Sequence, residues 1–155
     1  GTGLSAEAMM EKVKTGEIKA LYLAGSDPVK YIGEKAEEAL SRAELLIFQG
    51  TNFNASCKLA HVILPGATFV EKEGTFTNYQ GRLQRINKAL EPLGEAQADW
   101  EIFTRLGKRL GAYPSYRCAE EVFKDMAREV APFTGLSYQK IGPQGIKLTL
   151  PGGKP

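Results

Sequence analysis

The chain has 155 residues, of which 43% are hydrophobic and 25% charged, enough apolar residues for one folded domain of ordinary size. Its formal charge of +2 comes from interspersed basic and acidic residues, which excludes the one-signed field that attracts nucleic acids or anionic membranes. The sequence has no run of about 18 apolar residues, which argues against a membrane span. We expect no nucleic-acid partner, no direct membrane insertion and a cytoplasmic location.

A capped helix and a buried strand are predicted at the start of the chain. Ser5 is a residue type that accepts hydrogen bonds from the free N–H groups of a helix start, and Gly16 is placed to end the same helix. The short apolar run 20–24 follows and closes in Gly25-Ser26-Asp27-Pro28. A continuous apolar run that ends in turn residues is typical of a strand buried on both faces.

The next segments repeat this alternation of helix and strand. Residues 33–43 are predicted to form a helix, and residues 44–49 and 61–64 are two further apolar runs that end in loops. Strands without polar alternation, separated by short helical segments, indicate parallel β-α-β units. The predicted fold is therefore α/β, with a Rossmann-like, partly parallel sheet flanked by helices.

The second half of the chain has a different pattern. Residues 75–79 and 82–86 alternate in polarity around Gln80-Gly81, which predicts a hairpin or extended arm within residues 74–90. Two amphipathic helices follow, with apolar stripes at 102–110 and 119–130. The last segment, from Pro132, is expected to be irregular with one edge strand at 146–150. We thus expect an α/β domain at 1–131 and a tail at 132–155.

A ligand site is expected at the loops that follow the three strands. In an open parallel sheet, ligands bind beyond the carboxyl ends of the strands. Gly25-Ser26-Asp27-Pro28, Gln49-Gly50-Thr51-Asn52 and Leu64-Pro65-Gly66 all offer glycine for close backbone approach, and the first two add short polar side chains. A nucleotide-like ligand fits this pattern. The alternative, favoured by composition alone, is that these are ordinary turns of an α/β domain.

The usual catalytic and metal-binding patterns are missing from the sequence. His61 is the only histidine, and the chain has no GxSxG, Walker or GxGxxG motif. Cys57 and His61 have the spacing of half a metal site, but His61 begins an apolar run, so the two are expected to straddle a helix-to-strand boundary. Glu71 and Glu73 are interpreted as part of a solvated turn rather than as an acid–base pair. We expect no catalytic residue and no metal site.

Residues 61–84, HVILPGATFVEKEGTFTNYQGRLQ, resemble the most characteristic segment of the molybdopterin oxidoreductase family. The segments GEIKALYLAGSDP at 16–28 and GEAQADWEIFTRLGKRLG at 94–111 are also similar to that family, so the likeness covers nearly the whole chain. The resemblance implies the C-terminal half of a domain that holds the guanine dinucleotide end of a pterin cofactor, excised from a longer subunit. In catalytic relatives the ligands of the metal and of the iron–sulfur clusters lie upstream, so this fragment is expected to hold no cofactor of its own and to catalyse no redox reaction alone.

The resemblance also implies which side chains contact the cofactor. Carried over by position, the cofactor-binding residues are Ser26, Asp27, Thr51, Asn52, Asn54 and Ser56. The sequence departs from the family pattern at and near these positions: Asn54-Ala55-Ser56 replaces Thr-Glu-Thr, and Gly50 and His61 each replace Asp. These departures raise the alternative that the cofactor contacts are vestigial.

The departures favour one branch of the family. Gln49-Gly50, the ILPGA segment at 63–67 and the GLSYQKIGPQG segment at 135–145 resemble the large iron–sulfur subunit of respiratory NADH:quinone oxidoreductase (complex I), in which the fold generally lacks the pterin. The first hypothesis is thus a scaffold domain of that subunit, whose parent carries iron–sulfur clusters and lies on the cytoplasmic side of the inner membrane. Its partners would be the rest of the subunit and other subunits of the complex, and the isolated fragment is expected to expose an apolar face and to dimerise.

Two further hypotheses remain open. The well-kept EKEGTFTN segment at 71–78 supports a fragment of a formate dehydrogenase-like molybdenum or tungsten oxidoreductase that still contacts molybdopterin guanine dinucleotide. The clean first strand with its own capped helix leaves room for a freestanding small protein that binds a nucleotide or a partner.

Overall fold

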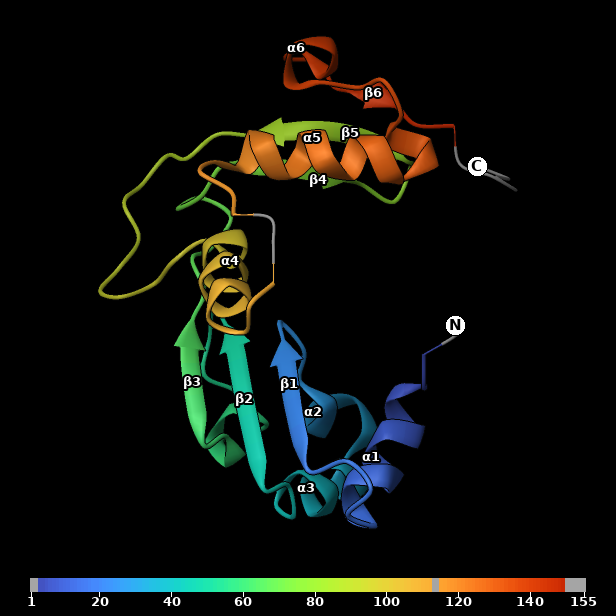
Figure 1. The fold of residues 1–155 in the computed structure, drawn as a ribbon, viewed down its shortest axis with the longest axis vertical. Coiled ribbons are helices and arrows are strands. Elements are labelled where there is room, and N and C mark those ends of the chain that lie inside the picture. The colour runs from blue at the N-terminus through green and yellow to red at the C-terminus, as the bar shows by residue number, and fades with distance from the viewer. Residues whose placement is uncertain (1–2, 113–114, 150–155) are drawn as a thin grey trace. The chain divides into compact units, whose positions relative to one another are not determined.

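The computed structural model describes residues 3–112 and 115–149, and the chain forms two compact units, Gly1–Gly66 and Ala67–Pro155 (Figure 1). The first unit contains a parallel three-stranded sheet with helices, and the second contains an antiparallel three-stranded sheet with helices. The predicted α/β class with a parallel sheet and a hairpin is therefore confirmed. Within the described ranges, every helix is too short or too polar to cross a bilayer.

The first unit begins as the sequence predicts. Helix α1, Ala6–Lys14, starts after Ser5, whose Oγ accepts a hydrogen bond of 3.2 Å from the N–H of Ala8. Strand β1 occupies Ala20–Ala24, the whole of the predicted apolar run, but only Leu23 is buried, so the expected burial on both faces is wrong for this strand. The remaining elements of this unit are α2 (Pro28–Ile32), α3 (Glu34–Leu40), β2 (Leu45–Gly50), the 3-10 helix η1 (Cys57–Leu59) and β3 (Val62–Pro65).

The helical segment between β1 and β2 is longer than predicted. The helix expected over residues 33–43 is present as α3, Glu34–Leu40, and a second short helix that was not expected, α2, precedes it and meets it at Gly33. Gly33 has a φ of 79°, a left-handed conformation that glycine adopts without steric cost and that interrupts a helix. Pro28 is not only a turn residue: it is the first residue of α2, where its missing N–H costs no helical hydrogen bond.

The three strands of the first unit run parallel in the order β1-β2-β3. The register places Leu23 beside Phe48 and Phe48 beside Ile63. Figure 1 shows the three arrows pointing the same way, so the loops that follow them leave from one edge of the sheet. The core of the unit is formed by buried apolar side chains of α1, β1, α3, β2, η1 and the turn between α3 and β2: Met10, Val13, Leu23, Ala36, Ala39, Leu40, Ala43, Leu46, Phe48 and Cys57.

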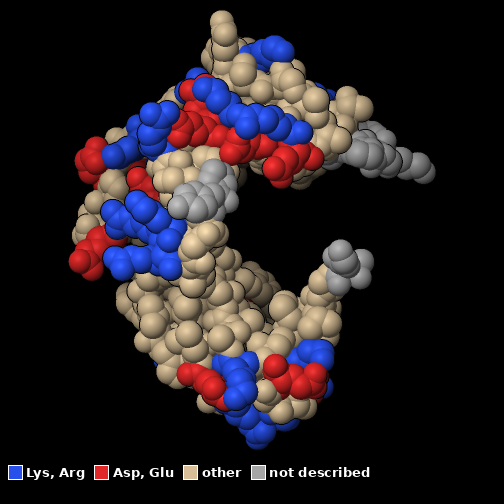
Figure 2. Space-filling view, viewed as in Figure 1, with Lys and Arg blue, Asp and Glu red and all other residues tan. Residues whose placement is uncertain are grey.

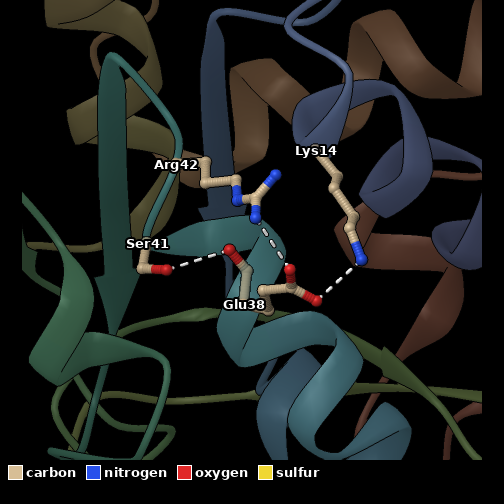
Figure 3. Close-up of polar contacts among 4 residues, drawn as sticks. All are labelled: Lys14, Glu38, Ser41 and Arg42. Atoms are coloured by element: carbon tan, nitrogen blue, oxygen red, sulfur yellow. Dashed lines mark hydrogen bonds and ion pairs between the residues drawn. The ribbon is translucent and has the colours of Figure 1, made fainter.

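Charged side chains join α1 to the end of α3 on the surface of this core (Figure 3). Glu38 accepts a bond of 2.7 Å from Lys14 Nζ and one of 2.9 Å from a guanidinium nitrogen of Arg42. The hydroxyl of Ser41 donates to the backbone oxygen of Glu38 over 2.9 Å. Because these groups are exposed, the ion pairs contribute little to stability, and the apolar core between the helices and the sheet contributes most.

The second unit contains the predicted hairpin. Strands β4 (Gly74–Thr77) and β5 (Arg82–Ile86) are antiparallel, and β6 (Ile146–Lys147) pairs with β5. At the turn, Asn78 Oδ1 accepts bonds from the N–H groups of Gln80 (3.0 Å) and Arg82 (2.9 Å). Gly81 has a φ of 75°, the left-handed value that such a turn requires.

Helices complete the second unit. They are α4 (Asp99–Arg109), α5 (Ala119–Glu129), the 3-10 helix η2 (Ala131–Phe133) and α6 (Tyr138–Ile141). The apolar stripe of α5 is buried at Ala119 and Phe123, but Val130 is exposed. On α4, Ile102 is buried but Leu110 is exposed. The edge strand expected at 146–150 is present only as β6, over Ile146–Lys147. The segment after Pro132 is less irregular than expected, because α6 adds Tyr138 to the same core as Phe123. Position 150, the end of the predicted edge strand, lies outside the described residues.

Candidate functional site

The candidate site lies where the parallel strands of the first unit end. The register places Ala24 of β1 beside Gln49 of β2, and Gln49 beside Leu64 of β3. Two more backbone bonds extend this alignment into the loops: the N–H of Gly25 donates to Gln49 over 2.8 Å, and the N–H of Gly66 donates to Gly50 over 2.9 Å. The sequence prediction that the loops after β1, β2 and β3 share one edge of the sheet is confirmed.

Two of the predicted site residues are bonded to each other. The hydroxyl of Ser56 donates to Oδ1 of Asp27 over 2.5 Å, and the backbone N–H of Ser56 donates to the same oxygen over 3.2 Å. Ser56 Oγ also accepts a bond of 3.1 Å from the N–H of Val29 in α2. Ser56 has an exposed fraction of 0%, so its hydroxyl is used entirely within the protein.

These bonds also control the ionisation of Asp27. The hydroxyl of Ser56 holds the pKa of the Asp27 carboxyl below its ordinary value of 3.8, against the partial burial of the group, which raises the pKa. Backbone N–H groups of Ser56, Lys30 and Ala55 lower it further. Asp27 is therefore a carboxylate at neutral pH, because hydrogen bonds to the charged form favour that form.

A third predicted residue, Asn54, organises the loop after β2. Its side-chain Oδ1 accepts a bond of 2.8 Å from the N–H of Cys57, and its backbone oxygen accepts one of 3.3 Å from the N–H of Lys58. Asn54 thereby covers free N–H groups at the start of η1, the position at which short polar side chains stabilise helix starts.

The other three predicted residues are exposed. Ser26 follows β1, and Thr51 and Asn52 follow β2; all three side chains face solvent. Asn52 Nδ2 donates to Thr51 Oγ1 over 3.1 Å. These side chains combine hydroxyl and amide groups, which suit a ligand rich in hydroxyl, phosphate and base-edge groups.

Gly50, one of the departures from the family pattern, is explained by its neighbour Phe48. A Cβ atom added to Gly50 would lie 2.7 Å from Cζ of Phe48, and the Phe48 ring is buried. An aspartate at position 50 therefore requires the Phe48 ring to move. The bulky Phe48 and the small Gly50 thus fit each other at this position.

Two features of this edge were missed by the sequence reasoning. Gln49 is almost completely buried, and its Oε1 accepts a hydrogen bond from the hydroxyl of Tyr22 on β1. The sequence signal for Gln49 is that it is an amide side chain within an otherwise apolar strand. Phe53 is 82% exposed and lies between Asn52 and Asn54; a large aromatic residue in a polar loop is unusual enough to have been noticed.

Cys57 and His61 lie as the sequence predicts, on the two sides of a helix-to-strand boundary. Cys57 is the first residue of η1, and His61 directly precedes β3. The Nδ1 atom of His61 accepts a bond of 2.9 Å from the N–H of Leu46. Within residues 3–112 and 115–149, no three histidine, cysteine or acidic side chains are placed to share a metal ion.

The interpretation of residues 71–73 as a solvated turn is wrong for two of the three residues. Glu71 is buried, and its Oε2 accepts bonds from the N–H (2.8 Å) and the hydroxyl (3.0 Å) of Thr68. Lys72 forms an ion pair with Asp99 at the start of α4. The burial of Glu71 was not predicted because nothing in the sequence shows that the backbone N–H groups of Thr68 and Leu93 come close to its carboxylate.

The parallel sheet with polar loops at its carboxyl edge defines an α/β module of the kind that binds nucleotide-like ligands. The profile of the molybdopterin oxidoreductase family matches residues 1–109. The chain therefore belongs to the molybdopterin oxidoreductase family. Membership implies a molybdopterin-type cofactor in the parent protein.

The relatives refine this placement. A putative formate dehydrogenase of Staphylococcus haemolyticus is 37% identical over 86% of this chain and 14% of its own length. The alpha subunit of F420-dependent formate dehydrogenase 1 of Methanococcus maripaludis is 37% identical over 93% of this chain and 22% of its own length. The alpha subunit of an NADPH-Fe(3+) oxidoreductase of Geobacter sulfurreducens is 37% identical over 91% of this chain and 16% of its own length. The chain thus spans between 14% and 22% of these three relatives.

A solved structure confirms the fold. Acetylene hydratase from Pelobacter acetylenicus superimposes with a TM-score of 0.75 over 97% of this chain and 22% of its own, at 18% sequence identity. At that identity the likeness concerns the fold alone. The named relatives support the formate dehydrogenase-like hypothesis better than the complex I hypothesis, which was placed first from the sequence.

Proposed function

We propose that this chain is part of the domain that holds the guanine dinucleotide end of a molybdopterin cofactor in a formate dehydrogenase-like molybdenum or tungsten oxidoreductase. The observation that carries the proposal is the 37% identity over most of this sequence to a putative formate dehydrogenase and to the alpha subunit of an F420-dependent formate dehydrogenase. The parent would be the oxidoreductase; this part would bind and orient the cofactor.

The residues at the carboxyl edge of the first sheet fit such a group. Ser26, Thr51 and Asn52 are exposed and offer hydroxyl and amide groups for hydrogen bonds to a ribose, a phosphate or a base edge. Gly25, with a φ of 61°, carries no Cβ that would keep a ligand from the backbone. When bound, the pterin and its metal would supply the redox chemistry, and these loops would hold the remote end of the cofactor.

GDP is a suitable probe, because it carries the guanine, ribose and diphosphate of that end. We expect titration of the chain with GDP to give saturable changes in the amide resonances of Ser26, Thr51 and Asn52, and ADP to bind more weakly. Amide signals at these positions that remain unchanged up to millimolar GDP would contradict the proposal for this edge. Metal analysis of the purified parent, with molybdenum or tungsten expected, tests the assignment independently.

The scaffold role in a complex I subunit is the second candidate. It is favoured by one specific observation: Asp27, Asn54 and Ser56 direct side-chain oxygens to their own backbone or to each other. This candidate predicts no GDP binding and no metal-ligating cysteine or selenocysteine upstream in the parent. The same titration and the parent sequence therefore decide between the two functions.

A further inference from the structure

We propose that Asp27 and Ser56 are positioning residues, which fasten the loop after β1 to the loop after β2 and so set the spacing of the exposed side chains that contact the dinucleotide. This inference rests on the proposed function for its ligand. It changes the role expected for two of the six predicted residues, from touching the cofactor to placing the residues that do.

The first support is the way in which the bonds connect the loops. Oδ1 of Asp27 accepts hydrogen bonds from both the hydroxyl and the N–H of Ser56. The hydroxyl oxygen of Ser56 in turn accepts a hydrogen bond from the N–H of Val29. The hydrogen bonds thus run in both directions between segments that are 27 to 29 residues apart in the chain. We call this group of three bonds the loop lock.

The second support is burial. A serine hydroxyl has one hydrogen to donate, and that of Ser56 is given to Asp27. Because Ser56 is fully buried, a ligand at the surface does not reach it. Ser26, next to Asp27, and Thr51 and Asn52, before Ser56, remain exposed on the same two loops.

The third support is that the loop after β2 has no helix or strand of its own before η1 begins. Residues 51–56 contain no helix or strand, and the loop lock acts at their far end. Fixing a loop before binding removes an entropic cost that the ligand would otherwise have to offset. Loss of the lock should therefore weaken binding even where the contacting side chains are intact.

The test compares Asp27→Ala, Ser56→Ala, the double variant, and Asp27→Asn, whose amide oxygen still accepts from Ser56. Val13→Ala is the matched control, since Val13 is a buried residue of α1 outside both loops.

We expect each alanine variant of the loop lock to raise the dissociation constant for GDP about tenfold. The double variant should bind about as weakly as either single variant, because the two residues act as one unit. Asp27→Asn should bind more tightly than Asp27→Ala, and Val13→Ala should be less stable with unchanged affinity.

Three results would overturn the positioning role. They are additive losses in the double variant, a loss in Asp27→Ala without one in Ser56→Ala, and an equal loss in Val13→Ala. Amide hydrogen exchange in residues 26–29 and 51–57 provides a readout without ligand, with faster exchange expected in the alanine variants of the lock but not in Val13→Ala. If the unaltered chain does not bind GDP, the proposed function fails. The exchange data still decide whether the loop lock orders the two loops. Exchange rates that are unchanged in both loops of the alanine variants would refute that role.

Discussion

The backbone N–H of Leu93 donates a hydrogen bond of 3.3 Å to Oε1 of Glu71, which ties the loop before α4 to the segment before β4. The other carboxylate oxygen of Glu71 receives two bonds from Thr68. One buried carboxylate thus holds two backbone segments that are 22 residues apart. This finding gives the charged residue that precedes β4 a structural role.

We expect Glu71→Gln to lower the thermal midpoint of unfolding by several degrees, because one carboxylate oxygen becomes an NH2 group, which cannot accept a hydrogen bond, and the remaining neutral oxygen accepts weaker ones. The N–H of Thr68 is the main cause that lowers the pKa of Glu71 from its ordinary value of 4.5. Calorimetry measures the midpoint, and Glu73→Gln, at an exposed position two residues later, is the matched control. Equal midpoints for the two variants would contradict the structural role of Glu71.

The loop lock has a predicted pH dependence. The pKa of Asp27 is lowered in the folded protein, so its contribution to stability is complete above the ordinary value of 3.8 and is lost as the pH falls through the lower folded value. The difference in unfolding free energy between the unaltered chain and Asp27→Asn should therefore be constant near neutral pH and shrink below about pH 4. Urea unfolding at a series of pH values measures it, and a difference that grows on acidification would show that the sign is wrong.

Phe53 is predicted to contact the guanine base. An exposed aromatic ring stacks on a base with about 1–3 kcal/mol, so Phe53→Ala should raise the dissociation constant for GDP by roughly fivefold to a hundredfold. Stability should change little, because the side chain is exposed. Tyr79→Ala, at an exposed position in the hairpin turn of the second unit, is the control and should bind GDP normally. Isothermal titration calorimetry measures both, and equal affinities would exclude the stacking role.

The fit between Phe48 and Gly50 gives a prediction about the core. Gly50→Ala should destabilise the protein by about 1–3 kcal/mol, because the new methyl group overlaps the buried ring and the core must shift. Combining it with Phe48→Leu should cost less than the sum of the two single changes. Chemical denaturation of the four proteins gives the coupling, and strict additivity would contradict the overlap.

The sequence predicts the elements of this fold better than the contacts between them. The apolar runs at β1 and β2 identify the strands, and Ser5 identifies the start of α1, because each signal is local. Helix α2 was missed, since Asp27-Pro28 after a strand is also typical of a simple turn. The site shows the same limit: polar residues at the strand ends are visible in the sequence, but the bonds between Asp27 and Ser56 depend on the register of β1 against β2.

The strands of the first unit carry apolar side chains that predict self-association of the isolated chain. Leu45, Val62 and Ile63 are each about two-fifths exposed, and β3 lies at one edge of the three-stranded sheet. On the face shown in Figure 2, the surface over β1, β2 and β3 carries hardly any charged side chains. An unprotected strand edge with an apolar surface favours pairing with another copy.

Light scattering over a dilution series should accordingly detect dimers that dissociate at low concentration. Val62→Lys should shift the equilibrium towards the monomer, because a lysine on an edge strand opposes pairing and is costly to bury. Leu93→Lys, which places the same charge at an exposed leucine of the second unit, controls for net charge and should associate like the unaltered chain. A chain that stays monomeric at every concentration would mean that the exposed strand surface of the first unit does not drive association.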